Sequence, residues 1–173
     1  PIHQRITGPD FFVKFSEKLN NSVNCRVFFM GGSDQTLGLI TEKVCKHFPN
    51  IVIAGTYSPS YTNFFSKNEL DVMINNINRS NSDVLWIGLG APKQEKWIFQ
   101  NIEKLNVKFV GAIGAAFDFY SGHVKRSPLF FRRLGLEWLI RLVLDPRRLW
   151  KRTFCSAPIF ILHVLRCRFK SLI

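Results

Sequence analysis

The sequence predicts an α/β fold in which a mostly parallel sheet carries helices on both faces, a Rossmann-like arrangement, followed by a basic helical C-terminal appendage. Three observations predict it. Short apolar runs rich in Val, Ile or Phe recur along residues 1–122, and each is closed by glycine. Segments of helical period lie between these runs, and no further strand is evident beyond residue 122.

Each element follows from its own pattern. The runs expected as buried strands are residues 26–30, 51–54, 84–89 and 107–113. The segments with helical period are residues 9–19, 34–48, 67–79 and 92–105. Asp34 is expected to cap the second of these helices, and Pro92 suits the first turn of the fourth, where its missing N–H costs nothing.

Charge divides the chain into two parts. Residues 123–173 hold 12 Lys and Arg against two acids, a net charge of +10, whereas residues 1–122 hold 12 against 10 acids, a net charge of +2. We therefore expect an α/β core at 1–122 and a basic appendage at 123–173. Such an asymmetry indicates a polyanionic partner, which is a nucleic acid, an anionic membrane face or a diphosphate.

The appendage mixes basic residues with apolar ones. Residues 157–165 are apolar but too few to span a bilayer, and Arg166, Arg168 and Lys170 follow at once. This composition is typical of a helix lying in a membrane interface, because apolar side chains enter the acyl boundary while basic ones meet anionic headgroups. The alternative is a helix docked on the core with solvated arginines.

The four cysteines form no C-x-x-C pair and have no histidine at metal-ligand spacing. Neither a metal site nor a disulfide framework is expected, and reduced thiols in a cytosolic compartment are predicted.

Glycines lie at the carboxyl ends of two of the expected strands. Gly31 and Gly32 close the strand 26–30 just before a helix, which lets the backbone approach a phosphate, although a tight turn without a ligand explains them equally well. Gly88 and Gly90 resemble half of a dinucleotide fingerprint. The third glycine of that fingerprint is absent, so no nicotinamide cofactor is expected.

Three polar side chains lie near the same strand ends. Lys93 and Gln94 fall at the N-terminus of the helix after Gly90, where an ammonium offsets phosphate charge and an amide hydrogen-bonds a sugar hydroxyl. Asp118, in a segment of small residues after the fourth strand, is suited to accept from ribose or sugar hydroxyls. The alternatives are a solvated polar first turn for Lys93 and Gln94, and a capping or turn role for Asp118.

A basic cluster lies in the appendage. Helical spacing places Arg141 and Arg148 on one face, unless Pro146 breaks the helix, and Lys151 and Arg152 follow one turn later. Because guanidinium groups bind diphosphate bidentately, a lipid diphosphate or a nucleotide is the expected ligand. A solvated charged face is the alternative.

Taken together, these residues resemble the WecG/TagA/CpsF family of bacterial glycosyltransferases over nearly the whole chain. The motifs that carry the resemblance are, in chain order, Arg5-Ile-Thr-Gly-Pro-Asp10, Phe28-Phe-Met-Gly-Gly32, Gly88-Leu-Gly-Ala-Pro-Lys-Gln-Glu-Lys-Trp97, Gly114 through Asp118 to Gly122, Lys125-Arg-Ser-Pro128, Gly135-Leu-Glu-Trp-Leu-Ile-Arg141 and Pro146-Arg-Arg148.

The resemblance implies transfer of N-acetylmannosamine or its uronic acid from a UDP-sugar donor to an undecaprenyl-diphosphate-linked N-acetylglucosamine, with inversion, in the synthesis of cell-surface polysaccharides such as teichoic acid. It implies no metal and no cofactor. The protein would act as a peripheral enzyme on the cytoplasmic face of the plasma membrane. The expected partners are the UDP-sugar, the polyprenyl-diphosphate-linked acceptor and an anionic membrane surface, whereas nucleic acid is not expected. The sequence leaves open whether the chain forms a homo-oligomer.

The resemblance also assigns residues. Arg5 and Gln94 match active-site positions of the family, and Arg141, Arg148 and Lys151 or Arg152 match arginines of its membrane-docking appendage. Family members carry a further N-terminal segment with an Asp-Gly motif whose aspartate is the proposed general base, and no residue here matches it. Little transferase activity is therefore expected of this chain alone, since a positioned base contributes about 10² to 10⁴-fold. A non-catalytic basic module that binds membrane or nucleic acid is the alternative class.

Overall fold

The computed structural model describes residues 6–22, 24–62 and 64–124 and, beyond them, residues 128, 130–131, 139, 142–143, 146 and 157–170. The chain divides into two compact units, Pro1–Lys125 and Arg126–Ile173. The first unit contains the sheet and its covering helices.

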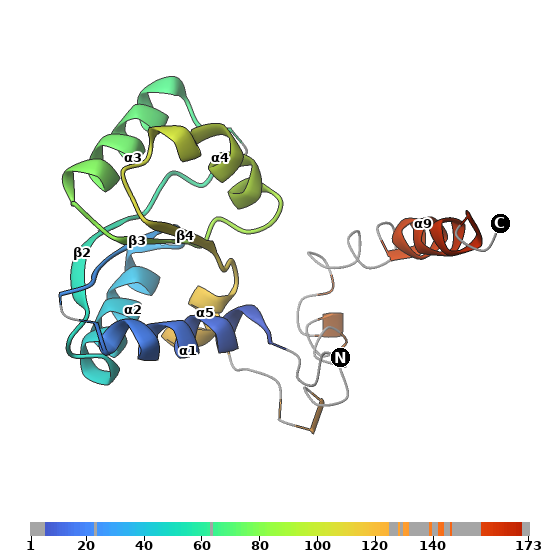
Figure 1. Cartoon of the computed structure of the whole chain (residues 1–173), viewed down its shortest axis with the longest axis horizontal. Coiled ribbons are helices and arrows are strands. Elements are labelled where there is room, and N and C mark those ends of the chain that lie inside the picture. Colours follow the sequence, from blue (N-terminus) through green and yellow to red (C-terminus); the bar gives the residue numbers. More distant parts are fainter. Residues whose placement is uncertain are drawn as a thin grey trace. The chain divides into compact units, whose positions relative to one another are not determined.

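Four strands form a wholly parallel sheet in the order β2-β1-β3-β4 (Figure 1). They are β1 (Arg26–Met30), β2 (Val52–Tyr57), β3 (Val84–Ile87) and β4 (Phe109–Ala112). The predicted parallel sheet is confirmed. The strand expected at 51–54 instead runs to Tyr57, because Gly55 does not end it. A Cβ on Gly55 would lie 2.7 Å from the ring of Phe28, so this glycine makes room for a neighbouring aromatic side chain.

Helices cover both faces of the sheet, as predicted (Figure 1). One face carries α1 (Gly8–Asn20), α2 (Asp34–His47) and α5 (Ala116–Ser121), and the other carries α3 (Lys67–Arg79) and α4 (Lys93–Asn101), which continues into the short helix η1 (Ile102–Lys104).

Two details of these helices differ from expectation. The cap of α2 is Ser33, whose hydroxyl accepts a hydrogen bond from the N–H of Thr36, so Asp34 lies in the first turn and not at the cap. Helix α5 was not predicted, because its six residues are too few to show a helical period.

The strand side chains alternate between two hydrophobic cores. On β1, Val27 and Phe29 pack on the α1, α2 and α5 side, whereas Phe28 and Met30 pack on the α3 and α4 side. On β3, Trp86 and Leu85 divide in the same way. Because both faces are buried, the strands are apolar without alternation, which is the pattern that the sequence shows.

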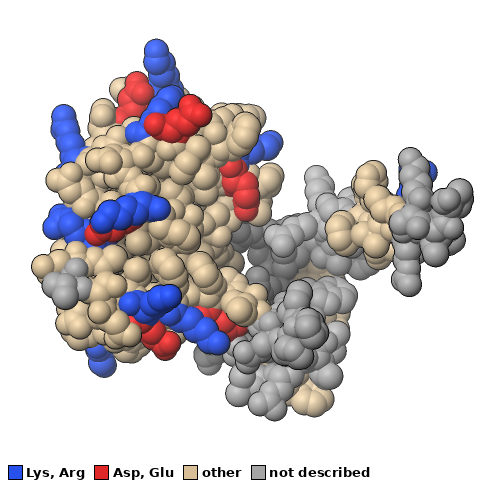
Figure 2. Space-filling model, viewed as in Figure 1, with Lys and Arg blue, Asp and Glu red and all other residues tan. Residues whose placement is uncertain are grey.

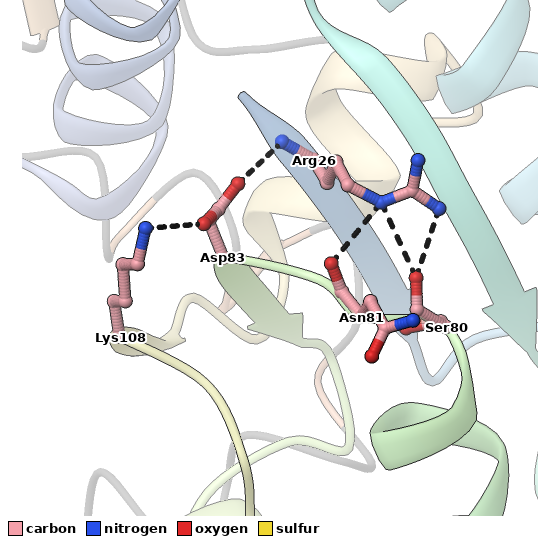
Figure 3. A network of polar contacts seen from close by, with 5 residues as sticks. All are labelled: Arg26, Ser80, Asn81, Asp83 and Lys108. Atoms are coloured by element: carbon pink, nitrogen blue, oxygen red, sulfur yellow. Dashed lines mark hydrogen bonds and ion pairs between the residues drawn. The ribbon is translucent and has the colours of Figure 1, made fainter. Parts of the chain in front are cut away.

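A polar network ties together the amino ends of three strands (Figure 3). The carboxylate of Asp83, just before β3, accepts from the backbone N–H of Arg26 at 2.9 Å and pairs with the ammonium of Lys108 at 2.8 Å. The guanidinium of Arg26 donates to the carbonyls of Ser80 and Asn81. These contacts hold the amino ends of the strands together, opposite to the carboxyl ends where the glycine turns lie.

In the second unit, α9 (Ala157–Lys170) is a helix whose described apolar side chains are exposed, among them Ile159, Phe160 and Ile161. None of the helices in the described part of the chain is long and apolar enough to cross a membrane. The rest of the expected appendage lies mostly outside the described residues and stays a prediction.

Candidate functional site

The strand order identifies where a ligand would bind. From β1 the chain crosses by α2 to β2 on one side, then returns past β1 to β3 and β4 on the other. The order therefore reverses between β1 and β3. In open parallel sheets, ligands bind outside the carboxyl ends of the strands at such a switch point. Gly31 follows β1 and Gly88 follows β3, so both predicted glycine turns lie there.

The two turns touch at the level of the backbone. Gly31 has φ +107°, and a Cβ on it would lie 2.6 Å from the carbonyl carbon of Gly88. A Cβ on Gly88 would lie 2.4 Å from the ring of Phe117 in α5. The N–H of Gly88 donates to the carbonyl of Met30 at 2.8 Å. Close packing alone therefore requires Gly31 and Gly88.

The second glycine of each turn differs from the first. Gly32 and Gly90 have φ +78° and +76°, and their surroundings leave room for a side chain. Within the described residues, the N–H groups of Gly32, Leu89 and Gly90 donate to no acceptor. Three backbone N–H donors are thus available at the switch point. Phosphate groups commonly bind to free backbone N–H groups of this kind.

Gln94 is buried at this edge. It lies in the first turn of α4, whose cap is Pro92, so Pro92 precedes the first turn in which it was expected. Only 5% of Gln94 is exposed, so it is not the solvated polar residue of the alternative. Its Nε2 donates to Glu95 Oε1 at 2.9 Å, and its Oε1 has no hydrogen-bond partner among the described residues. A Cβ on Gly114, beyond β4, would lie 3.4 Å from that Oε1.

Lys93 reaches toward a different segment. Its ammonium donates to the carbonyl of Thr62 and lies 3.6 Å from the centroid of the Phe65 ring. Burial lowers the pKa of Lys93, and Glu69 opposes that shift. The structure therefore places this charge against the loop between β2 and α3, and its predicted role toward phosphate stays a prediction.

Asp118 lies in α5, half-buried, and its backbone carbonyl accepts from Val124 N–H at 3.1 Å and from the hydroxyl of Ser121 at 3.0 Å. Its proposed contact with sugar hydroxyls stays a prediction. Five other predicted site residues lie outside the described residues: Arg5, Arg141, Arg148, Lys151 and Arg152.

The segment after Arg5 lies by the carboxyl end of β4. A Cβ on Gly8 would lie 3.7 Å from the carbonyl oxygen of Ile113. Thr7 and Asp10 form a capping box that begins α1 beside this strand end. The predicted helix at 9–19 omits this start, although a threonine followed three residues later by an acidic residue is the sequence signal for it.

A separate pocket of about 640 Å³ lies on the α1, α2 and α5 side, lined by Val13, Glu17, His47 and Tyr120 among others. Burial raises the pKa of Tyr120 to about 12, and its hydroxyl lies 3.1 Å from Nδ1 of His47. The residues of the switch point do not line this pocket. No cluster of three or more potential metal ligands occurs within the described residues.

Comparison with known proteins gives a consistent result. The profile of the "Glycosyl transferase WecG/TagA/CpsF family" matches residues 1–172. The chain is 36% identical over 166 residues to the N-acetylglucosaminyldiphosphoundecaprenol N-acetyl-beta-D-mannosaminyltransferase of Bacillus spizizenii, with 96% of this chain and 61% of the relative covered. The Bacillus subtilis protein of the same name is 37% identical, with 95% and 61% covered.

A protein of that name from Staphylococcus aureus strain MRSA252 is 26% identical over 172 residues, with 98% of this chain and 63% of the relative covered. The chain thus spans less than two thirds of the length of these curated relatives.

Proposed function

Because the chain belongs to the WecG/TagA/CpsF family of glycosyl transferases, we propose that it takes part in the transfer of an N-acetylhexosamine-type sugar from UDP to a polyprenyl-diphosphate-linked N-acetylglucosamine. The sugar is N-acetylmannosamine or its uronic acid. The names of the Bacillus and Staphylococcus relatives, which specify an N-acetylmannosaminyl group and an undecaprenol-linked acceptor, support this choice.

The observation that carries the proposal is the switch point between β1 and β3. The available N–H groups of Gly32 and Gly90 lie in the turns after β1 and β3. The buried amide of Gln94 lies in the first turn of α4, just after the second of these turns. A bound diphosphate accepts hydrogen bonds from N–H donors, and a bound sugar is oriented by hydrogen bonds to an amide or a hydroxyl. Both kinds of group are present at one sheet edge.

The reaction expected from the family is a direct displacement. A base takes the proton of the acceptor hydroxyl, the hydroxyl oxygen attacks the anomeric carbon, and the bond to UDP breaks with inversion. In this chain, the backbone donors and Arg5 would stabilise the negative charge that develops on the leaving diphosphate. Gln94 and Asp118 would orient the sugar, while Arg141, Arg148, Lys151 and Arg152 would hold the lipid diphosphate.

A lipid-linked acceptor requires access to a membrane. We place the protein on the inner face of the plasma membrane as a peripheral protein, held by the basic appendage. The exposed apolar side chains of α9, with Arg166 beyond them, support this assignment.

The test is a calorimetric titration of the protein with UDP and with UDP-N-acetylmannosamine, followed by an assay of transfer to a short-chain analogue of the lipid acceptor. UDP should bind, and Gln94→Ala or Asp118→Ala should weaken binding of the sugar nucleotide. Equal affinities in wild type and in both folded variants would remove these residues from the site. Absence of any UDP binding would overturn the proposed function.

A further inference from the structure

We infer that Glu95 is a positioning residue that holds the amide of Gln94 in one orientation, so that Gln94 Oε1 accepts a hydrogen bond from an O–H or N–H group of the bound sugar nucleotide. This inference rests on the proposed function and specifies the ligand chemistry of the same site.

The first step is the orientation of the amide. A glutamine amide can turn over, which exchanges its oxygen and nitrogen. Here one end lies 2.9 Å from Glu95 Oε1. An ionised carboxylate only accepts hydrogen bonds, so the NH₂ end of Gln94 must face it. The reversed orientation would bring two oxygens with partial or full negative charge together. Glu95 therefore fixes the position of the Gln94 oxygen.

The second step concerns Gln94 Oε1, a buried acceptor with no hydrogen-bond partner among the described residues. Gln94 is only 5% exposed, and its Oε1 is one of four buried side-chain atoms in the described part of the chain that have no partner. The other three belong to Ser82, which precedes β3, and to the indoles of Trp86 and Trp97 in the hydrophobic cores. Gln94 Oε1 is the one of these atoms that adjoins Gly114, at the carboxyl end of β4. Buried polar atoms in proteins are normally paired, so this oxygen indicates a partner that arrives with the ligand.

The third step is the chemistry of that partner. The diphosphate of a sugar nucleotide carries acceptor oxygens only, and two acceptors cannot pair. The partner must therefore be a donor: a hydroxyl or the acetamido N–H of the sugar, or the N–H or ribose hydroxyls of the uridine. The diphosphate is left to the backbone N–H groups of Gly32 and Gly90, which are donors.

The experiment measures dissociation constants of UDP and UDP-N-acetylmannosamine by calorimetry. Four proteins form a cycle: wild type, Gln94→Met, Glu95→Ala and the double variant. Methionine is close to glutamine in size, but it replaces the amide oxygen by a thioether sulfur, which is only a weak acceptor. We expect Gln94→Met to weaken binding of the sugar nucleotide about fivefold, the usual effect of one neutral hydrogen bond. Glu95→Ala should weaken binding of the sugar nucleotide in the wild-type background. In the double variant, it should have no effect beyond that of Gln94→Met.

That non-additivity separates positioning from a structural role. If Glu95 acted only as an acidic residue in the first turn of α4, its replacement would have the same effect in both backgrounds. Glu95→Gln, which keeps an acceptor oxygen, should retain part of the affinity. The matched control is Gln100→Met, at an exposed position of the same helix, which should change neither dissociation constant. Thermal unfolding of each variant verifies that it is folded.

The two ligands locate the donor. A loss confined to UDP-N-acetylmannosamine places it on the sugar, and an equal loss for UDP places it on the uridine. Unchanged affinities for both ligands in Gln94→Met and Glu95→Ala, with wild type binding normally, would overturn the inference while leaving the proposed function intact. A wild type that binds no sugar nucleotide would overturn the proposed function itself, and the inference with it.

The orientation can also be tested without a ligand. In ¹⁵N-labelled protein, the side-chain NH₂ of Gln94 should exchange slowly with solvent, and Glu95→Ala should speed that exchange. Rapid exchange in wild type would show that Glu95 does not hold the amide.

Discussion

At the scale of single residues, the switch point contains glycines of two kinds. Gly31 and Gly88 are required by packing, because a side chain at either position would overlap a neighbouring backbone segment or aromatic ring. Gly32 and Gly90 have positive φ, and a Cβ on either would make at most an ordinary van der Waals contact, so turn geometry and not packing selects them. In these turns, one glycine allows close packing of the backbone, and the next leaves its N–H group available to a ligand.

The packing requirement makes a prediction for Gly88→Ala. Its methyl group would lie 2.4 Å from the Phe117 ring, so α5 or the β3 turn must shift. Overpacking of this kind costs about 1–3 kcal/mol. Urea unfolding should show that loss of stability. The control is Gly38→Ala, in α2 with nothing within 4 Å of the new methyl group, which should raise stability by up to about 1 kcal/mol. Equal stabilities of the two variants would contradict the packing argument.

At the scale of elements, polar contacts join the amino ends of the strands, and a ligand has access at their carboxyl ends. Asp83 and Arg26 join β1, β3 and the segment before β4 at the amino ends of the strands (Figure 3). At the carboxyl edge, backbone donors and one buried acceptor have no partner within the described residues. A rigid amino edge allows these unpaired groups to be held in place before a ligand binds.

The amino-edge network predicts a pH dependence. The hydrogen bond from Lys108, and then that from the backbone N–H of Arg26, lower the pKa of Asp83. A carboxylate with a lowered folded-state pKa contributes stability at pH above its unfolded value of about 3.9, and loses that contribution as the pH falls through the folded value. Asp83→Asn should therefore be less stable than wild type at pH 7. The difference should narrow below about pH 4.

Urea unfolding at a series of pH values measures this difference, and added salt should reduce it because Lys108 is solvent-exposed. The matched control is Asp71→Asn, at an exposed position of α3, which should change stability at pH 7 by less than about 0.5 kcal/mol. A difference between wild type and Asp83→Asn that stays constant from pH 7 to pH 3 would show that the ionised carboxylate is not the stabilising group.

At the scale of the whole molecule, charge is divided unequally between residues 1–122 and residues 123–173. The net charge of +2 on residues 1–122 fits Figure 2, where acidic side chains lie beside basic ones on the face of the first unit that is drawn. The net charge of +10 belongs to residues 123–173, which also contain the exposed apolar side chains of α9. Within α9, the apolar residues Ile159 to Leu162 precede the basic residues Arg166, Arg168 and Lys170.

This distribution predicts binding to anionic vesicles through the appendage. Each Lys or Arg near such a surface contributes about 1 kcal/mol before screening, and buried apolar side chains add to it. Removal of residues 147–173 should abolish most co-sedimentation with vesicles of anionic lipid. Rising salt should weaken binding by the intact chain without eliminating it, because the apolar contribution is not screened.

A pair of point variants serves as the matched control. Phe160→Ser removes an exposed phenylalanine of α9 and should weaken vesicle binding, whereas Phe99→Ser removes an exposed phenylalanine of α4 and should not. Binding that survives the truncation, or duplex DNA that competes more strongly than anionic lipid, would exclude a membrane role for the appendage.

The sequence alone determined the order and type of most elements. Runs such as residues 26–30 and 67–79 were predicted to the residue, because parallel strands buried on both faces and amphipathic helices leave strong local patterns. The motifs also identified the family, and their place after apolar runs put Gly31 and Gly88 at strand ends and Gln94 at the start of a helix.

Only the tertiary structure decided what these residues contact. Gly55 continues β2 because of Phe28, Gln94 is buried beside Gly114, and Lys93 turns toward Thr62. None of these contacts is local in sequence. A local pattern records which residues favour a strand, a turn or a helix start. Which side chain fills a given space depends on segments brought together by folding, and that information is in the packing of the sheet against its helices.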